Sequence, residues 1–259
     1  SVGLVSELRN RLKRFTPEYI KSFIYAYARM GLPVLLGLSF KDGDHLITVT
    51  GYKEEIDSGF TRRKSMALKA SKIERFYAHD DQVGPFTKIK IEKDGTLTTS
   101  WRVSPDKDEM RTARPVSICV PVHSKIRLTF ENVYTKSRFL DFFFLKSFPK
   151  VAIAWDIFLC LSNNYKKETM ISTTLSESTK YSLATIPLPR CVWIARGIVK
   201  GKTVIELLFD ATQIATSESC IKINVHDDSL KSVFAVALKE ECTKDDLIAN
   251  LGRSFYDHL

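Results

Sequence analysis

The sequence predicts an α+β protein in which helices and antiparallel strands are mixed without regular alternation. Two observations lead to this expectation: a well-marked amphipathic helix at residues 16–31, and a series of short β-rich runs from residue 34 onward. Regular alternation of strand and helix, which is typical of a doubly wound parallel sheet, is not seen. With 259 residues, 44% of them apolar, the chain is long enough for one large domain or two ordinary ones, each with a core.

The helix at residues 16–31 has both of its ends marked in the sequence. Thr16 is a suitable N-cap, and Pro17 fits the first helical position because its missing N–H would be unpaired there in any case. Gly31 is the expected stop. The apolar residues of one helical stripe recur at the spacing i, i+3, i+4, i+7: Ile20, Phe23, Ile24 and Tyr27.

Beyond this helix the apolar pattern becomes that of strands. Val34–Leu38 and His45–Tyr52 flank the turn Lys41–Asp44 and predict a hairpin. Ile73–His79 is the next expected strand, and Asp94-Gly95 between two β-rich runs predicts a second hairpin. A helix followed by two hairpins is therefore expected in the first half of the chain.

The remaining segments are assigned from weaker signals. In the first half we expect an early helix over Val5–Arg14, a short helix around Ser65–Lys72, and a charged loop at Pro105–Arg111 before a strand at Val116–Val122. In the second half we expect helices and strands as follows: helices within Phe130–Leu145, at Tyr165–Ile171 and at Asp245–Leu251, and strands at Val151–Leu161, Cys191–Val199 and Thr203–Phe209. The expected division is a first domain at residues 1–125 and a mixed α/β accessory region at residues 126–259.

Charge and hydropathy limit the classes of partner. The formal net charge is +9, and most of the excess lies in residues 1–130, so an anionic partner is one reading and a solvated basic face is the other. The densest basic run, Arg62-Arg63-Lys64, has no nucleic-acid-binding motif around it, which leaves nucleic acid the weaker alternative. No apolar run approaches the about 20 residues that a membrane span needs. We expect a cytoplasmic protein without a membrane span.

The cysteines indicate neither a metal site nor a redox motif. The five thiols are widely spaced and form no CxxC pair, so we expect reduced cysteines and no cofactor or metal. Because Cys119, Cys160 and Cys191 lie in apolar β-type runs, we predict that all three are buried and unreactive. The triplet His-Asp-Asp occurs twice, beginning at His79 and at His226. It is a weak signal for a metal site, since adjacent strand residues cannot converge on one ion.

One stretch of sequence carries a more specific pattern. It reads Gly31-Leu32-Pro33-Val34-Leu35-Leu36-Gly37-Leu38, then Gly43-Asp44-His45-Leu46-Ile47-Thr48-Val49-Thr50-Gly51-Tyr52, and later Phe76-Tyr77-Ala78-His79-Asp80-Asp81-Gln82-Val83-Gly84-Pro85-Phe86. This resembles the region around the catalytic His of papain-like cysteine peptidases, particularly those that process bacteriocin leaders. The resemblance covers about residues 16–86. It implies a papain-like half with an antiparallel sheet at residues 1–125.

The resemblance implies a role for three residues. His45, at the opening of a hairpin strand, would be the general base, and Asp80 or Asp81, at the end of the neighbouring strand, would orient its ring. Adjacent strand residues point to opposite faces, so only one aspartate is expected to reach the imidazole, and Asp80 is favoured because it follows the strand most directly.

The sequence departs from the family where the nucleophile should be. A catalytic Cys is expected upstream of His45, but no cysteine precedes Cys119. Two functions therefore stay open. The first is thiol-dependent hydrolysis of a peptide or isopeptide bond, with the Cys supplied by another segment or chain. The second is an inactive peptidase-fold module that binds a protein or an anionic partner.

Overall fold

The chain folds as an α+β protein made of two compact units. The computed structural model describes residues 4–10, 15–55, 59–60, 66–104, 107–213, 220–226 and 230–232, and it describes only the backbone of residues 4–10, 103–104 and 107–109. The first unit combines residues 1–58 with 68–124, and the second combines residues 59–67 with 125–259. The boundary expected from the sequence lay between residues 125 and 126, with residues 59–67 in the first domain.

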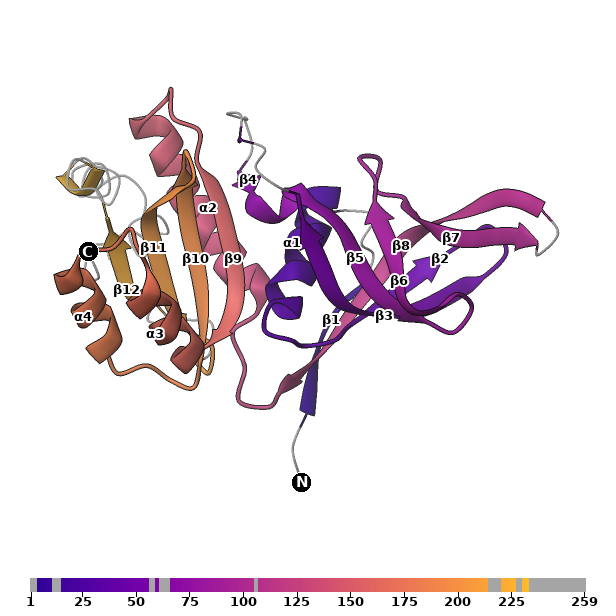
Figure 1. The fold of residues 1–259 in the computed structure, drawn as a ribbon, viewed down its shortest axis with the longest axis horizontal. Coiled ribbons are helices and arrows are strands. Elements are labelled where there is room, and N and C mark those ends of the chain that lie inside the picture. Colours follow the sequence, from indigo (N-terminus) through magenta and orange to yellow (C-terminus); the bar gives the residue numbers. More distant parts are fainter. Residues whose placement is uncertain are drawn as a thin grey trace. The chain divides into compact units, whose positions relative to one another are not determined.

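The first unit is a closed antiparallel barrel of six strands (Figure 1). In chain order its strands are β2 (Val34–Ser39), β3 (Asp44–Glu54), β5 (Ile73–Asp80), β6 (Gly84–Ile91), β7 (Leu97–Ser104) and β8 (Lys107–His123). Each strand pairs with the next, and β8 closes the barrel by pairing with both β7 and β2. A further strand, β1 (Leu4–Asn10), pairs with the later part of β8.

Buried and less buried side chains alternate along the strands, and the buried ones fill the barrel interior. In β2 the side chains of Val34, Leu36 and Leu38 are fully buried while those between them are half-buried. Such a small barrel holds side chains rather than a channel. Helix α1 (Pro17–Ala28) packs on β2 and β3, and it begins as predicted, with Thr16 Oγ1 accepting from the Tyr19 amide at 3.2 Å.

Three expected elements differ from the structure, and the first of these errors concerns pairing with a distant segment. The early helix is instead strand β1, whose Leu4 lies opposite His123. The charged loop at Pro105–Arg111 is largely strand, because β8 begins at Lys107 and pairs with β7 there. The short helix expected around Ser65–Lys72 is a two-residue strand, β4 (Ala67–Leu68), followed by the 3₁₀ helix η2 (Lys69–Lys72).

The second unit is a sheet with helices on both faces (Figure 1). Its strands follow the order β12-β11-β10-β9-β4, with bounds β9 (Ala154–Leu161), β10 (Cys191–Val199), β11 (Lys202–Asp210) and β12 (Cys220–Val225). Helix α2 (Phe130–Ser147) covers one face, and α3 (Ser162–Ile171) and α4 (Glu177–Thr185) cover the other. Helix α4 was not predicted, and the helix expected at Asp245–Leu251 lies outside the described residues.

The two faces of this sheet differ in chemistry. Trp155 and Trp193 point toward α2. The Trp155 indole donates to Asp141 of that helix, and the ring centroids of Trp193 and Phe130 are 6.3 Å apart. Arg196 and Glu206 point toward α3 and form an ion pair there, in which Glu206 is buried and Arg196 is half-buried. None of the helices in the described part of the chain has both the length and the apolar character needed to span a bilayer.

Candidate functional site

His45 and Asp80 meet at one end of the barrel. His45 is the second residue of β3, Asp80 is the last residue of β5, and the two strands pair antiparallel. The start of one strand therefore lies beside the end of the other. His45 Nε2 lies 3.0 Å from Asp80 Oδ1, which is the separation expected for a hydrogen-bonded His–Asp pair.

Asp80 is held by three donors besides the histidine. Its Oδ1 accepts from the backbone amides of Gln82 at 2.8 Å and Val83 at 3.3 Å, in the turn that follows β5. Its Oδ2 accepts from the indole N–H of Trp101 at 2.8 Å. The Asp80 side chain is only 1% exposed, so its orientation is fixed by these bonds rather than by solvent.

These contacts keep the Asp80 carboxyl ionised. Burial pushes its pKa upward, but the hydrogen bonds from Trp101, Gln82 and His45 outweigh burial and hold the pKa below its ordinary value. An ionised Asp80 accepts the Nε2–H of His45 and so favours the tautomer in which Nδ1 carries the lone pair. Nδ1 is therefore the ring nitrogen that remains to take a proton.

Asp81 also lies near the ring, contrary to expectation. Its Oδ1 is 3.4 Å from His45 Nε2, although its side chain is 83% exposed. Asp81 does not follow the alternation of a strand, because β5 ends at Asp80 and Asp81 already belongs to the turn. Both aspartates therefore face the imidazole, one as a buried partner and the other as an exposed one.

Aromatic rings support the pair from the side. The Phe40 ring lies 6.4 Å from the His45 ring and meets Trp101 edge-on at 5.1 Å. The guanidinium of Arg111 lies over the Phe40 ring, with its carbon 4.3 Å from the ring centroid, and it also pairs with Asp42. These contacts pack the His45 side chain so that only 10% of it is exposed.

The described cysteines do not lie beside His45. Register places Cys119 opposite Leu35, on the outer side of the barrel wall, whereas His45 lies opposite the inward-facing Leu38. Cys119 is half-buried rather than buried, so the prediction of a buried Cys119 is wrong; the outer wall position explains why.

The other described thiols belong to the second unit. Cys160, Cys191 and Cys220 are all buried, and for the first two this was the expectation. Burial raises the pKa of Cys191, and it raises the pKa of Cys220 to about 12, which disfavours the reactive thiolate in both. Cys242 lies outside the described residues.

A metal ion is poorly suited to this site. One ligand atom each from His45, Asp80 and Asp81 lie within 4.8 Å of one another. However, both oxygens of Asp80 already accept hydrogen bonds from N–H groups, which a bound cation would have to displace. His79 stands apart from the cluster on the exposed face of β5, where its ring contacts that of Phe86 at 4.9 Å.

Sequence reasoning missed the residues that support the pair. Trp101 was expected only as a core or edge aromatic, and nothing in its neighbourhood marks it as a donor to Asp80, which lies 21 residues earlier. The charged residues of the second sheet were also missed. A signal was present in Arg196 and Glu206, since a charge inside an apolar strand run indicates a buried partner.

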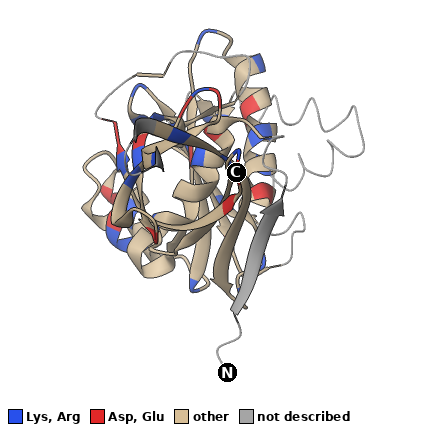
Figure 2. Ribbon diagram, turned by 90° about the vertical axis from the view of Figure 1, so that its right-hand side faces the viewer, with Lys and Arg blue, Asp and Glu red and all other residues tan. Residues whose placement is uncertain are grey.

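Comparison of the sequence with models of known protein families finds no match, and comparison with curated proteins finds none either. In the view of Figure 2, Lys and Arg are interspersed with Asp and Glu along the ribbon.

Proposed function

We propose that the barrel unit is a papain-like module in which His45 is the general base and Asp80 orients it, for thiol-dependent hydrolysis of a peptide or isopeptide bond. The observation that carries the proposal is the hydrogen bond from His45 Nε2 to a buried carboxylate that is fixed by three further donors. An imidazole oriented in this way presents Nδ1 to a thiol.

The nucleophile in this proposal comes from outside the described residues or from another chain. The outer wall position of Cys119 and the burial of Cys160, Cys191 and Cys220 argue against these four thiols. The accessory role of the second unit and the expected peptide or protein substrate belong to the same proposal.

A catalytically inactive binding module is the second candidate. It is favoured by the low exposure of the His45 side chain, 10%, which restricts the approach of a substrate. In that case the His45–Asp80 pair stabilises the end of the barrel, and a protein or anionic partner binds elsewhere on the basic first half.

Peptide hydrolysis by the natural gene product that contains these residues separates the two candidates. We expect turnover that iodoacetamide abolishes, and that falls by about 10³-fold or more in His45→Ala. Asp80→Asn should lower kcat because it disturbs the tautomer. His79→Ala is the matched control, since His79 lies one residue before Asp80 on β5 but faces away from the pair.

We expect residues 1–259 alone to show no thiol-dependent turnover, because none of the described cysteines lies beside His45. Turnover by residues 1–259 that Cys242→Ala abolishes would make Cys242, which lies outside the described residues, the nucleophile. Turnover by the gene product that survives His45→Ala would remove His45 from catalysis. A gene product with no turnover on a broad peptide library would leave the binding module as the function of this unit.

A further inference from the structure

A row of polar side chains crosses the second sheet on the face covered by α3 and α4. Asp156, Arg196, Glu206 and Asn224 are direct cross-strand partners on β9, β10, β11 and β12. The three carboxylate and amide side chains of this row are each at least nine-tenths buried. Buried polar residues in such a row are costly unless each finds a partner.

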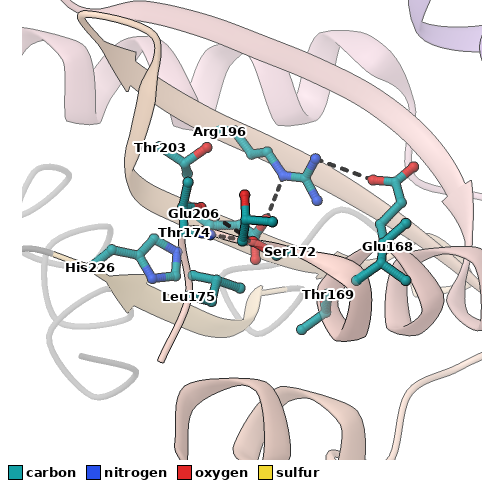
Figure 3. A pocket seen from close by; sticks show the side chains of 11 residues that line it. Glu168, Thr169, Ser172, Thr174, Leu175, Arg196, Thr203, Glu206 and His226 are labelled. Atoms are coloured by element: carbon teal, nitrogen blue, oxygen red, sulfur yellow. Dashed lines mark hydrogen bonds and ion pairs between the residues drawn. The ribbon is translucent and has the colours of Figure 1, made fainter. Parts of the chain in front are cut away.

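Most of the row is satisfied internally. Arg196 Nε donates to Glu206 Oε2 at 2.6 Å, and its Nη1 lies 3.3 Å from Glu168 Oε2 on α3 (Figure 3). The Tyr165 hydroxyl donates to the other Glu206 oxygen at 2.6 Å. The charge of Glu206 is therefore compensated by Arg196 and Tyr165 before any ligand is considered.

Asn224 is the exception at the end of this row. It is 9% exposed, and its Nδ2 is buried without a hydrogen-bond partner among the described residues. A buried N–H donor without an acceptor is destabilising, so such groups in native proteins commonly have a ligand or water that satisfies them. Asn224 lines a pocket of about 610 Å³ between β12 and α4.

The lining of this pocket suits an anion. Its described titratable residues are Lys222, Lys231 and His226, with no carboxylate among them. The first turn of α4 contributes further residues to the lining: Ser176, Ser178 and Thr179. The positive end of the helix dipole favours negative charge here, and one amide of this turn, that of Thr179, donates to the capping Ser176 side chain at 3.2 Å. The one acidic residue of this turn, Glu177, is 87% exposed and pairs with Lys180.

We propose that this pocket binds the phosphate group of a small phosphate monoester, with Asn224 Nδ2 and Lys222 Nζ as donors. Lys222 Nζ now lies 3.4 Å from Ser182 Oγ, a weak contact that a phosphate oxygen can replace. The volume exceeds that of a phosphate ion. A neighbouring pocket of about 320 Å³, drawn in Figure 3, shares Thr174, Leu175 and His226 with it and provides room for the rest of the molecule.

The test is titration of ¹⁵N-labelled protein with inorganic phosphate, glycerol 3-phosphate and glycerol at constant ionic strength. We expect saturable shifts of the Asn224 side-chain amide and of the amides at residues 177–179, with phosphate half-saturating below about 20 mM. Glycerol 3-phosphate should bind more tightly than phosphate, and glycerol should cause no shift.

Two variants and a matched control sharpen the result. Asn224→Leu keeps the branched shape and the number of side-chain heavy atoms, should fold because it removes an unpaired buried amide, and should weaken binding about fivefold. Lys222→Gln should weaken it about tenfold. Lys202→Gln, an exposed lysine of the adjacent strand β11 outside the pocket, should leave affinity unchanged. Shifts that rise linearly with phosphate, or equal affinity in Lys222→Gln and Lys202→Gln, would overturn the site. Equal affinity for phosphate and glycerol 3-phosphate would overturn the monoester as ligand.

Discussion

Asp80 in the barrel and Asp141 in the second unit are two buried aspartates. Each has a tryptophan as a hydrogen-bond donor, but their pKa values are shifted in opposite directions. Each accepts an indole N–H at 2.8 Å, Asp80 from Trp101 and Asp141 from Trp155. Yet the pKa of Asp80 is held below its ordinary value, whereas burial raises the pKa of Asp141 to about 6.

The difference lies in how many hydrogen-bond donors each carboxylate has in addition to the indole N–H. Asp80 ends a strand, so the turn after it supplies two backbone amides, and the facing strand supplies His45. Asp141 lies within helix α2, where backbone amides are used by the helix itself, and Trp155 is its one donor among the described residues. One hydrogen bond does not offset the cost of burying the charge, but four do.

Replacing Asp80 should have the largest effect on stability. In Asp80→Asn the amide NH₂ faces N–H donors, so a buried donor is left unpaired and the network loses its charge. We expect the free energy of unfolding at pH 7 to fall by about 3 kcal/mol. Urea unfolding of the two proteins measures it.

The pH dependence gives a control for that change. Because the folded pKa of Asp80 is lowered, its contribution to stability is present above the unfolded pKa of about 3.9 and is lost as pH falls through the folded value. The difference between wild type and Asp80→Asn should therefore shrink below about pH 4. A constant difference from pH 7 to pH 3 would contradict the role assigned to the ionised carboxylate.

Asp141→Asn should have a smaller effect of opposite sign. The folded pKa of about 6 lies above the unfolded value, so the wild-type contribution is present below about pH 4 and is lost as pH rises through 6. Asparagine carries no charge to bury, and the pKa difference of about two units is worth about 3 kcal/mol. The buried NH₂ group of the asparagine costs about 1 kcal/mol of this, so the variant should be more stable at pH 8 by about 2 kcal/mol. Urea unfolding at pH 4 and pH 8 measures this. A variant that is less stable at pH 8 would show that the Asp141 charge is favourable.

Removing each indole donor tests the count of hydrogen bonds directly. Trp155→Phe takes away the one described donor of Asp141 and should raise its pKa further, by about one unit. Trp101→Phe leaves Asp80 with His45 and two backbone amides, so Asp80 should stay ionised at pH 7. Carboxyl ¹³C shifts followed against pH report both residues. Equal changes in the two variants would mean that the indole dominates at both sites.

Asp81→Asn should have the smallest effect. Although Asp81 Oδ1 is 3.4 Å from His45 Nε2, the side chain is 83% exposed, and solvent screens the contact. We expect the free energy of unfolding to change by less than about 0.5 kcal/mol. A loss as large as that of Asp80→Asn would assign the two aspartates equal shares in holding the ring.

Local signals account for the parts of the fold that were predicted correctly. The cap at Thr16 and the turn before His45 are encoded within a few residues, and α1 and the β2–β3 hairpin follow from them. The approach of His45 to Asp80 needed only that the next strand lie beside the hairpin. The family resemblance and the catalytic role stay predictions.

Long-range pairing accounts for most of the parts that were missed. Nothing near Leu4 indicates that it pairs with His123. The charged start of β8 was missed for a local reason: it forms a hairpin with the adjoining strand β7, with Lys107 opposite Ser104, although its charged residues show no strand pattern. The donors to Asp80 and Asp141 come from tryptophans on other elements. The opposite pKa shifts of the two aspartates therefore follow from tertiary structure and not from the neighbouring sequence.

Strand β8 also has a consequence for the order of folding. It is the last strand of the barrel to be synthesised, and it must pair with β7, β2 and β1. During translation β1 and β2 expose edges until residues 107–123 emerge, and these non-local pairings slow barrel closure. Strand β4, whose neighbour in the second sheet is β9, is by then already made and can pair only after β9 has been synthesised. A nascent chain that stops before β8 therefore carries open strand edges, which are the surfaces that a chaperone or another nascent chain recognises.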